Sequence, residues 1–154
     1  MIQRKQTVYL FLAVVATIVC LCLPLGTVQL PVMGAEPVLF NMALVQTVDN
    51  SPVYDFSYSP LMVLLAIVTL CQLVAIFMYK KRIRQSRVCA LNIALLLLWM
   101  LVFAYFKYVR LTDLGSLQQS WVAILPFGAA VFNYLAYKGI RADERLVRAA
   151  DRIR

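Results

Sequence analysis

The chain has 154 residues, of which 63% are hydrophobic and 14% charged, and its formal net charge is +8. These residues leave room for one small membrane domain, over 1–154, and for no separate soluble domain. The sequence contains no histidine, so it lacks the commonest general base and the commonest metal ligand. Together these bounds predict an all-α membrane protein that is not an enzyme.

Four stretches without a charged residue divide the chain, and they hold 30, 24, 19 and 24 residues. About 20 apolar residues in a helix cross the hydrocarbon core of a bilayer, so each stretch can hold one spanning helix. The sequence therefore predicts a four-transmembrane-helix bundle. The four predicted spans cover about residues 6–26, 59–79, 88–108 and 119–137.

Basic residues fall on alternate sides of these predicted spans. If the N-terminus is cytoplasmic, 13 of the 15 lysines and arginines lie inside, and only Lys107 and Arg110 lie outside. The positive-inside rule therefore predicts cytoplasmic N- and C-termini. Anionic lipid of the inner leaflet is the expected partner of the basic inner face, in preference to nucleic acid or a ribosome.

The longest predicted loop, residues 27–58, follows the first span. Hydrophobic residues alternate at period two on both sides of 33–37, which is typical of short half-buried strands. We expect a small β-hairpin over the outer end of the bundle, with its turn at 33–37 and the end of its second strand near 49–52. Apolar strands need a surface to pack on, so the hairpin should lie on the helices or on a partner.

Two residues of the later spans carry structural information. Trp99 lies in the middle of the third span, so we expect its side chain to face another helix. Pro126 lies inside the predicted fourth span and removes a backbone donor, so we expect it to kink that helix.

The last segment, residues 139–154, has apolar and charged residues on different sides of a helix. We expect a separate cytoplasmic amphipathic C-terminal helix against the inner membrane surface, with a break from the fourth span at Gly139 or Asp143. The predicted contact residues of this tail are Arg141, Glu144, Leu146, Val147, Arg148, Asp151, Arg152 and Ile153.

Few polar residues lie inside the predicted spans, and none of them is an acid, which argues against a pump or an ion-coupled transporter. Gln72, Asn92 and Asn133 all lie within about 6–10 Å of the inner surface by helical rise, and they form a predicted intramembrane polar cluster. The cluster can supply hydrogen bonds between helices or form part of a ligand pocket, and both interpretations remain open. The sequence indicates no catalytic, cofactor-binding or metal-binding residue.

The four cysteines do not form an obvious redox pair. Cys20 and Cys22 point about 200° apart on a helix, and Cys71 and Cys89 lie at different depths, so we expect no disulfide. No C-x-x-C motif occurs, which makes a thiol oxidoreductase the weakest functional hypothesis.

Both ends of the chain carry patterned sequences, MIQRKQTVY at the start and DERLVRAADRIR at the end. This pattern resembles a bacterial family of short four-span inner-membrane proteins of unknown function, and the resemblance covers the whole chain. It implies a Gram-negative inner membrane and supports the predicted topology. It implies no activity, substrate or catalytic residue.

These observations predict a structural or accessory subunit of a larger inner-membrane assembly, with no chemistry of its own. The patterned tail and the apolar outer loop would both cover surfaces of a membrane-protein partner. The alternative from another class is a small carrier or lipid-handling protein that uses the polar cluster in the inner half of the bundle.

Overall fold

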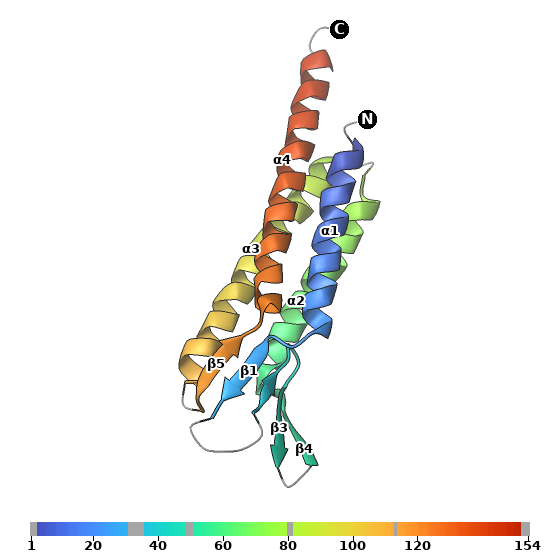
Figure 1. Ribbon diagram of the computed structural model, residues 1–154. Helices are drawn as coiled ribbons and strands as arrows, with labels where there is room; N and C mark the ends of the chain where they lie inside the picture. The colour runs from blue at the N-terminus through green and yellow to red at the C-terminus, as the bar shows by residue number, and fades with distance from the viewer. Residues whose placement is uncertain (1–2, 31–35, 49–50, 80–81, 113, 152–154) are drawn as a thin grey trace.

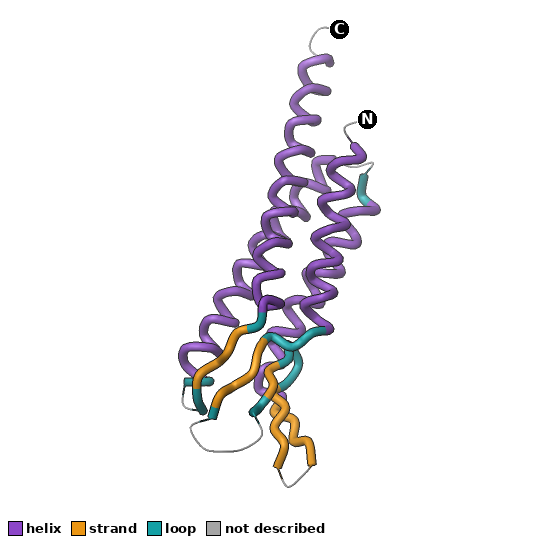
Figure 2. The backbone as a smooth tube through the Cα atoms, viewed as in Figure 1, coloured by secondary structure: helices purple, strands orange, loops and turns teal. Residues whose placement is uncertain are grey.

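The computed structural model describes residues 3–30, 36–48, 51–79, 82–112 and 114–151. Four long helices lie side by side, and α4 packs between α1 and α3 while α2 packs against both of these (Figure 1). Their bounds are α1 Gln3–Cys22, α2 Ser59–Phe77, α3 Arg82–Tyr105 and α4 Leu125–Asp151. A sheet lies at the opposite end from the start of α1 (Figure 2). We call these the sheet end and the terminal end of the bundle.

Among the described residues, three helical segments are long and apolar enough to cross a membrane: Lys5–Cys22, Phe56–Phe77 and Ile83–Arg110. They agree with the first three predicted spans. The predicted fourth span, 119–137, is not one continuous α-helix. Residue 119 ends a strand, 121–124 form a 3₁₀ turn, and α4 begins only at Leu125. Helix α4 has 13 residues before its first charge at Lys138, and it is not among the segments that are long and apolar enough to cross a membrane.

The expected hairpin is part of a larger antiparallel sheet of five strands, in the order β4-β3-β2-β1-β5. Strands β1 and β2 do pair, as expected, through Gly26↔Leu39 and Thr27↔Val38. The strands are β1 Gly26–Gln29, β2 Val38–Leu39, β3 Leu44–Val48, β4 Ser51–Asp55 and β5 Ser116–Gln119. Strands β3 and β4 pair from Leu44↔Asp55 to Val48↔Ser51. Residues 51–52, expected at the end of the second strand, therefore begin β4, and 49–50 lie outside the described residues. The expected turn at 33–37 falls mostly outside the described residues.

The second predicted strand ends early because the chain turns at 40–43. The Phe40 N–H donates to the Ala43 carbonyl at 2.9 Å, and the Asn41 side chain is buried. Its Nδ2 donates to the Cys20 carbonyl, one of the last in α1, at 2.6 Å. A side chain thus satisfies a helix-end carbonyl that has no partner within the helix. This bond stabilises the turn in place of a longer strand.

Strand β5 joins the sheet across a long sequence separation. It pairs with β1 over four residue pairs, from Gly26↔Gln119 to Gln29↔Ser116. The approach is so close that a Cβ added at Gly26 would lie 2.3 Å from the Gln118 carbonyl oxygen. Glycine is therefore required at this point, and the pairing joins the end of α1 to the connection between α3 and α4.

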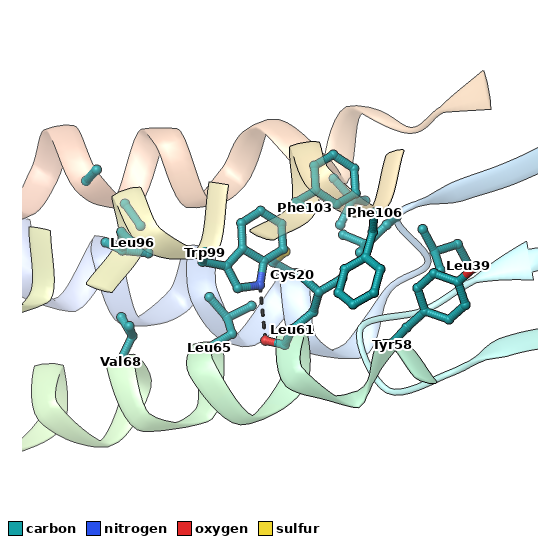
Figure 3. Packing of buried hydrophobic residues seen from close by; sticks show 14 of the residues in the cluster. Cys20, Leu39, Tyr58, Leu61, Leu65, Val68, Leu96, Trp99, Phe103 and Phe106 are labelled. Atoms are coloured by element: carbon teal, nitrogen blue, oxygen red, sulfur yellow. Dashed lines mark hydrogen bonds between the residues drawn. The ribbon is translucent and has the colours of Figure 1, made fainter. Parts of the chain in front are cut away.

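The core is continuous from the helices into the sheet (Figure 3). Trp99 is fully buried, its Nε1 donates to the Leu61 carbonyl of α2 at 3.1 Å, and its ring stacks on Phe103 at 5.3 Å. The expectation that Trp99 faces another helix is therefore confirmed. Nearer the sheet, Tyr58 and Phe106 pack with ring centroids 5.0 Å apart. They lie in two short helical segments, η1 Phe56–Tyr58 and η2 Phe106–Arg110; a third, η3 Trp121–Ile124, precedes α4.

Two expectations for the last helix are wrong. Pro126 is the second residue of α4, where no intrahelical bond needs its missing N–H, so it begins the helix instead of kinking it. The helix then continues without a break through Gly139 and Asp143 to Asp151. Gly139 lies inside this helix, at a close approach to α1: a Cβ there would be 3.1 Å from the Gln6 Cγ. The tail is therefore a direct continuation of α4.

Candidate functional site at the terminal end

A buried hydrogen bond joins the two patterned ends of the sequence. The Gln6 Nε2 of α1 donates to the Asp143 Oδ2 of α4 at 2.6 Å, across 137 positions of sequence. Both residues are only 8% exposed. Gly139 lies one helical turn before Asp143 and leaves room for the Gln6 side chain. The first and last segments of the chain are thus one structural unit.

The chemistry of this contact makes it energetically important. A hydrogen bond to a charged group is short and contributes about 1.5–3 kcal/mol, roughly twice a neutral one. A buried carboxylate without a donor would be strongly unfavourable. The Gln6–Asp143 contact therefore fixes the base of the tail against α1, at the level where α4 leaves the bundle.

Side chains at the start of α3 hold the same end of the molecule. The buried Gln85 side chain donates to the Ala75 carbonyl at 3.0 Å, which satisfies one of the last carbonyls of α2. The buried Ser86 hydroxyl donates to the Ile83 carbonyl at 2.9 Å. The Gln85 bond thus positions the first turns of α3 against the end of α2.

The three carboxamides of the predicted polar cluster, Gln72, Asn92 and Asn133, are all fully buried. The Thr17 hydroxyl of α1 lies 3.1 Å from the Gln72 Oε1, and Asn133 donates to the Ala129 carbonyl of its own helix at 2.8 Å. Neither polar atom of Asn92 has a hydrogen-bond partner, so no bond joins it to the other two. The structure thus joins Gln72 to α1 through Thr17, which sequence reasoning left outside the cluster.

Six of the eight residues predicted as tail contacts lie on the last turns of α4. Arg141 is exposed, with its guanidinium 5.3 Å from the centre of the Tyr137 ring. Glu144 is half-buried, and Leu146 and Val147 are 64% and 47% exposed. In Figure 1 this part of α4 extends past the ends of the other helices. The side chains of Arg148 and Asp151, and all of Arg152 and Ile153, lie outside the described part of the structure.

The sheet end has a different chemical character. An apolar groove of about 790 Å³ opens between α1, α2 and the β3–β4 hairpin, with Leu21, Met62 and Tyr54 in its walls. Between the lining residues Tyr54 and Phe56, Asp55 accepts hydrogen bonds from the Ser57 hydroxyl at 2.6 Å and the Ser57 N–H at 3.0 Å. These two bonds, with a smaller contribution from Arg110, lower the pKa of the Asp55 carboxyl. This end therefore offers apolar surface where the terminal end offers polar and charged groups.

The described residues contain neither a cluster of metal-ligand side chains nor a disulfide. Within them no group of three or more His, Cys, Asp or Glu side chains lies close enough to hold a metal ion. All four cysteines are free, and Cys20 and Cys89 are buried.

Four packed helices, three of them long and apolar enough to span a membrane, with a sheet at one end, define the class: a small helical membrane protein. The chain belongs to the DUF4293 family, a domain of unknown function whose family model matches residues 2–153. No curated protein and no solved structure matches the chain significantly. The family description contains no activity.

Proposed function

We propose that the chain is a four-span protein of a bacterial inner membrane with both termini in the cytoplasm. Helix α4 packs between α1 and α3, both of spanning length, so a bilayer around these two must also surround α4. The uncharged segment from Trp121 to Tyr137 has 17 residues when η3 is included, the lower limit for a span. The distribution of 13 cations on the terminal side supports the orientation.

In this membrane we propose that the protein is an accessory subunit of a larger assembly, with no chemistry of its own, and that the tail of α4 is its docking element. One observation carries the proposal: α4 continues as a helix past the bundle and exposes Leu146 and Val147. A helix lying flat on the membrane would bury such residues in lipid. A helix that continues a span points into water instead, where neighbouring apolar residues need a protein surface to cover them.

The test is affinity purification of the full chain from native membranes in mild detergent, followed by mass spectrometry. We expect a stoichiometric partner with the unaltered chain and its loss with Leu146→Glu/Val147→Glu. A matched control is Val48→Glu/Val53→Glu in the β3–β4 hairpin, where the two side chains are 50% and 49% exposed. This control should keep the partner if docking is specific to the tail. An unaltered chain that purifies alone, or a tail variant that keeps the partner, would refute the proposal.

The apolar groove at the sheet end favours a second candidate function, the handling of lipid. In the proposed orientation the groove lies near the outer leaflet, and its volume of about 790 Å³ with apolar walls suits an acyl chain. Native mass spectrometry distinguishes the two functions. Lipid handling requires a bound lipid on a chain without protein partner, and Ala43→Phe, which fills the groove, should remove that lipid. The accessory-subunit function is insensitive to this substitution.

A further inference from the structure

A polar pocket at the terminal end is separate from the surface assigned to partner docking. It has a volume of about 310 Å³ and lies between the start of α3 and the last turns of α4. Its walls are made by Ile83, Ser86, Arg87, Arg141, Glu144 and Arg145.

The charge of the pocket favours an anion. Three arginines, from two helices distant in sequence, and one acidic residue, Glu144, line this space. The net charge of the lining side chains is therefore +2. The five N–H donors of a guanidinium form a planar fork that matches the oxygens of a phosphate group.

The backbone adds to this preference. The pocket lies at the first two turns of α3, which begins at Arg82, has 24 residues and carries no acidic residue in its first turn. The first N–H groups of a helix have no partner within the helix, and the helix dipole places a partial positive charge there. Phosphate groups bind such helix starts readily.

Two of the lining residues are also held in place before any ligand arrives. The Arg141 guanidinium lies over the Tyr137 ring at 5.3 Å, and a cation on an aromatic face is restrained in its position. Ser86 is 4% exposed and bonded to Ile83, while the neighbouring Gln85 is bonded to α2. A preorganised wall lowers the entropic cost of binding.

We propose that this pocket binds a phosphate group, as the phosphodiester of an anionic phospholipid or as free phosphate. The chemistry depends only on the residues above, whereas contact with inner-leaflet headgroups rests on the orientation proposed for the chain. In that orientation the pocket lies at headgroup depth, and the half-exposed apolar side chain of Ile83 lies at its edge.

The test uses the purified full chain in neutral detergent, without any partner. Native mass spectrometry measures binding of phosphatidylglycerol against phosphatidylcholine, and a thermal shift with sodium phosphate against sodium chloride at equal ionic strength measures free anion. We expect each of Arg87→Gln, Arg141→Gln and Arg145→Gln to weaken binding about 5-fold, since one cation near an anionic headgroup contributes about that factor. The control is Arg84→Gln, an exposed arginine of the same segment that does not line the pocket.

The outcomes separate the two sources of phosphate. Phosphatidylglycerol retained without any phosphate shift assigns the pocket to lipid, and a phosphate shift alone assigns it to the free anion. The proposal is overturned if neither anion binds better than its neutral or chloride control, or if the Arg84 variant loses as much binding as the pocket variants. Should one arginine variant misfold, the other two give the same comparison. Because no partner is present, these results are independent of whether the tail docks on another protein.

Discussion

The Gln6–Asp143 contact gives the sharpest test of the reasoning, because it joins two helices through one pair of atoms. Gln6→Ala removes the amide that donates to Asp143 Oδ2 at 2.6 Å and leaves a carboxylate that is only 8% exposed without this donor. Asp143→Ala removes the acceptor and leaves a neutral amide buried. Gln6→Ala/Asp143→Ala removes both the amide donor and the carboxylate acceptor, so no buried polar group is left without its partner.

The expected magnitudes follow from these three situations. The single change at Gln6 should cost about 2–3 kcal/mol of unfolding free energy, since it removes a charge-assisted bond. The change at Asp143 should cost about 1–3 kcal/mol, since a neutral buried group loses its partner. The double variant should cost less than the sum of the two, by a coupling energy of about 1.5–3 kcal/mol.

The assay is reversible unfolding in mixed micelles with increasing sodium dodecyl sulfate, followed by far-ultraviolet circular dichroism. Gln85→Ala is the matched control, because Gln85 is also a buried glutamine that donates across helices, but to the neutral Ala75 carbonyl. Its pairing with Asp143→Ala should be additive to within about 0.5 kcal/mol. If the Gln6 and Asp143 changes are equally additive, the contact does not hold the tail to α1.

Three further predictions concern the strand approach, the pH dependence and the topology. Gly26→Ala should prevent β1–β5 pairing and lower the midpoint of thermal unfolding. The control Gly128→Ala places a Cβ with nothing within 4 Å, so it should raise helix stability by up to about 1 kcal/mol in the same measurement. Folding lowers the Asp55 pKa from 3.8, so the ionised carboxylate stabilises the fold above about pH 4, and this stabilisation is lost as the pH falls through the folded pKa. Asp55→Asn should remove this part of the pH dependence of the unfolding midpoint. An unchanged pH profile would contradict this role of Asp55. In a cysteine-free background, Arg84→Cys should react with label only from the cytoplasm and Asn50→Cys only from outside, and the reverse labelling would reject the proposed orientation.

The helices could be predicted from sequence because charges are excluded from the hydrocarbon core, and the gaps between charges mark the spans directly. The last helix shows the limit of this signal. A charge-free stretch gives the place of a span but not its secondary structure, and 116–119 pair with β1 instead of lengthening α4. Their partner strand lies about 90 positions earlier in the sequence. Only tertiary structure could reveal that pairing.

The sequence predicted that the carboxamides of the candidate site are buried, but not which residues they contact. Burial of Gln72, Asn92 and Asn133 follows from their place in the spans, since carboxamides avoid lipid. Their bonding partners do not follow, because a shift of one residue on a helix turns a side chain by about 100°. In the same way the patterned termini were recognisable separately, yet nothing local indicates that Gln6 and Asp143 meet.

Because α4 is one continuous helix, it carries residues of the phosphate pocket and also the two docking residues Leu146 and Val147. At about 100° per residue, Arg141 and Arg145 lie on nearly the opposite side of the helix from Leu146 and Val147. The arginines of the phosphate pocket and the two docking residues therefore share one helix but point to different sides of it. A bound headgroup would restrain the base of the tail from one side, together with the Gln6–Asp143 contact, while the partner approaches from the other. We expect binding of the two to be compatible: the Leu146→Glu/Val147→Glu chain should still bind phosphate, and the arginine variants should still recover the partner.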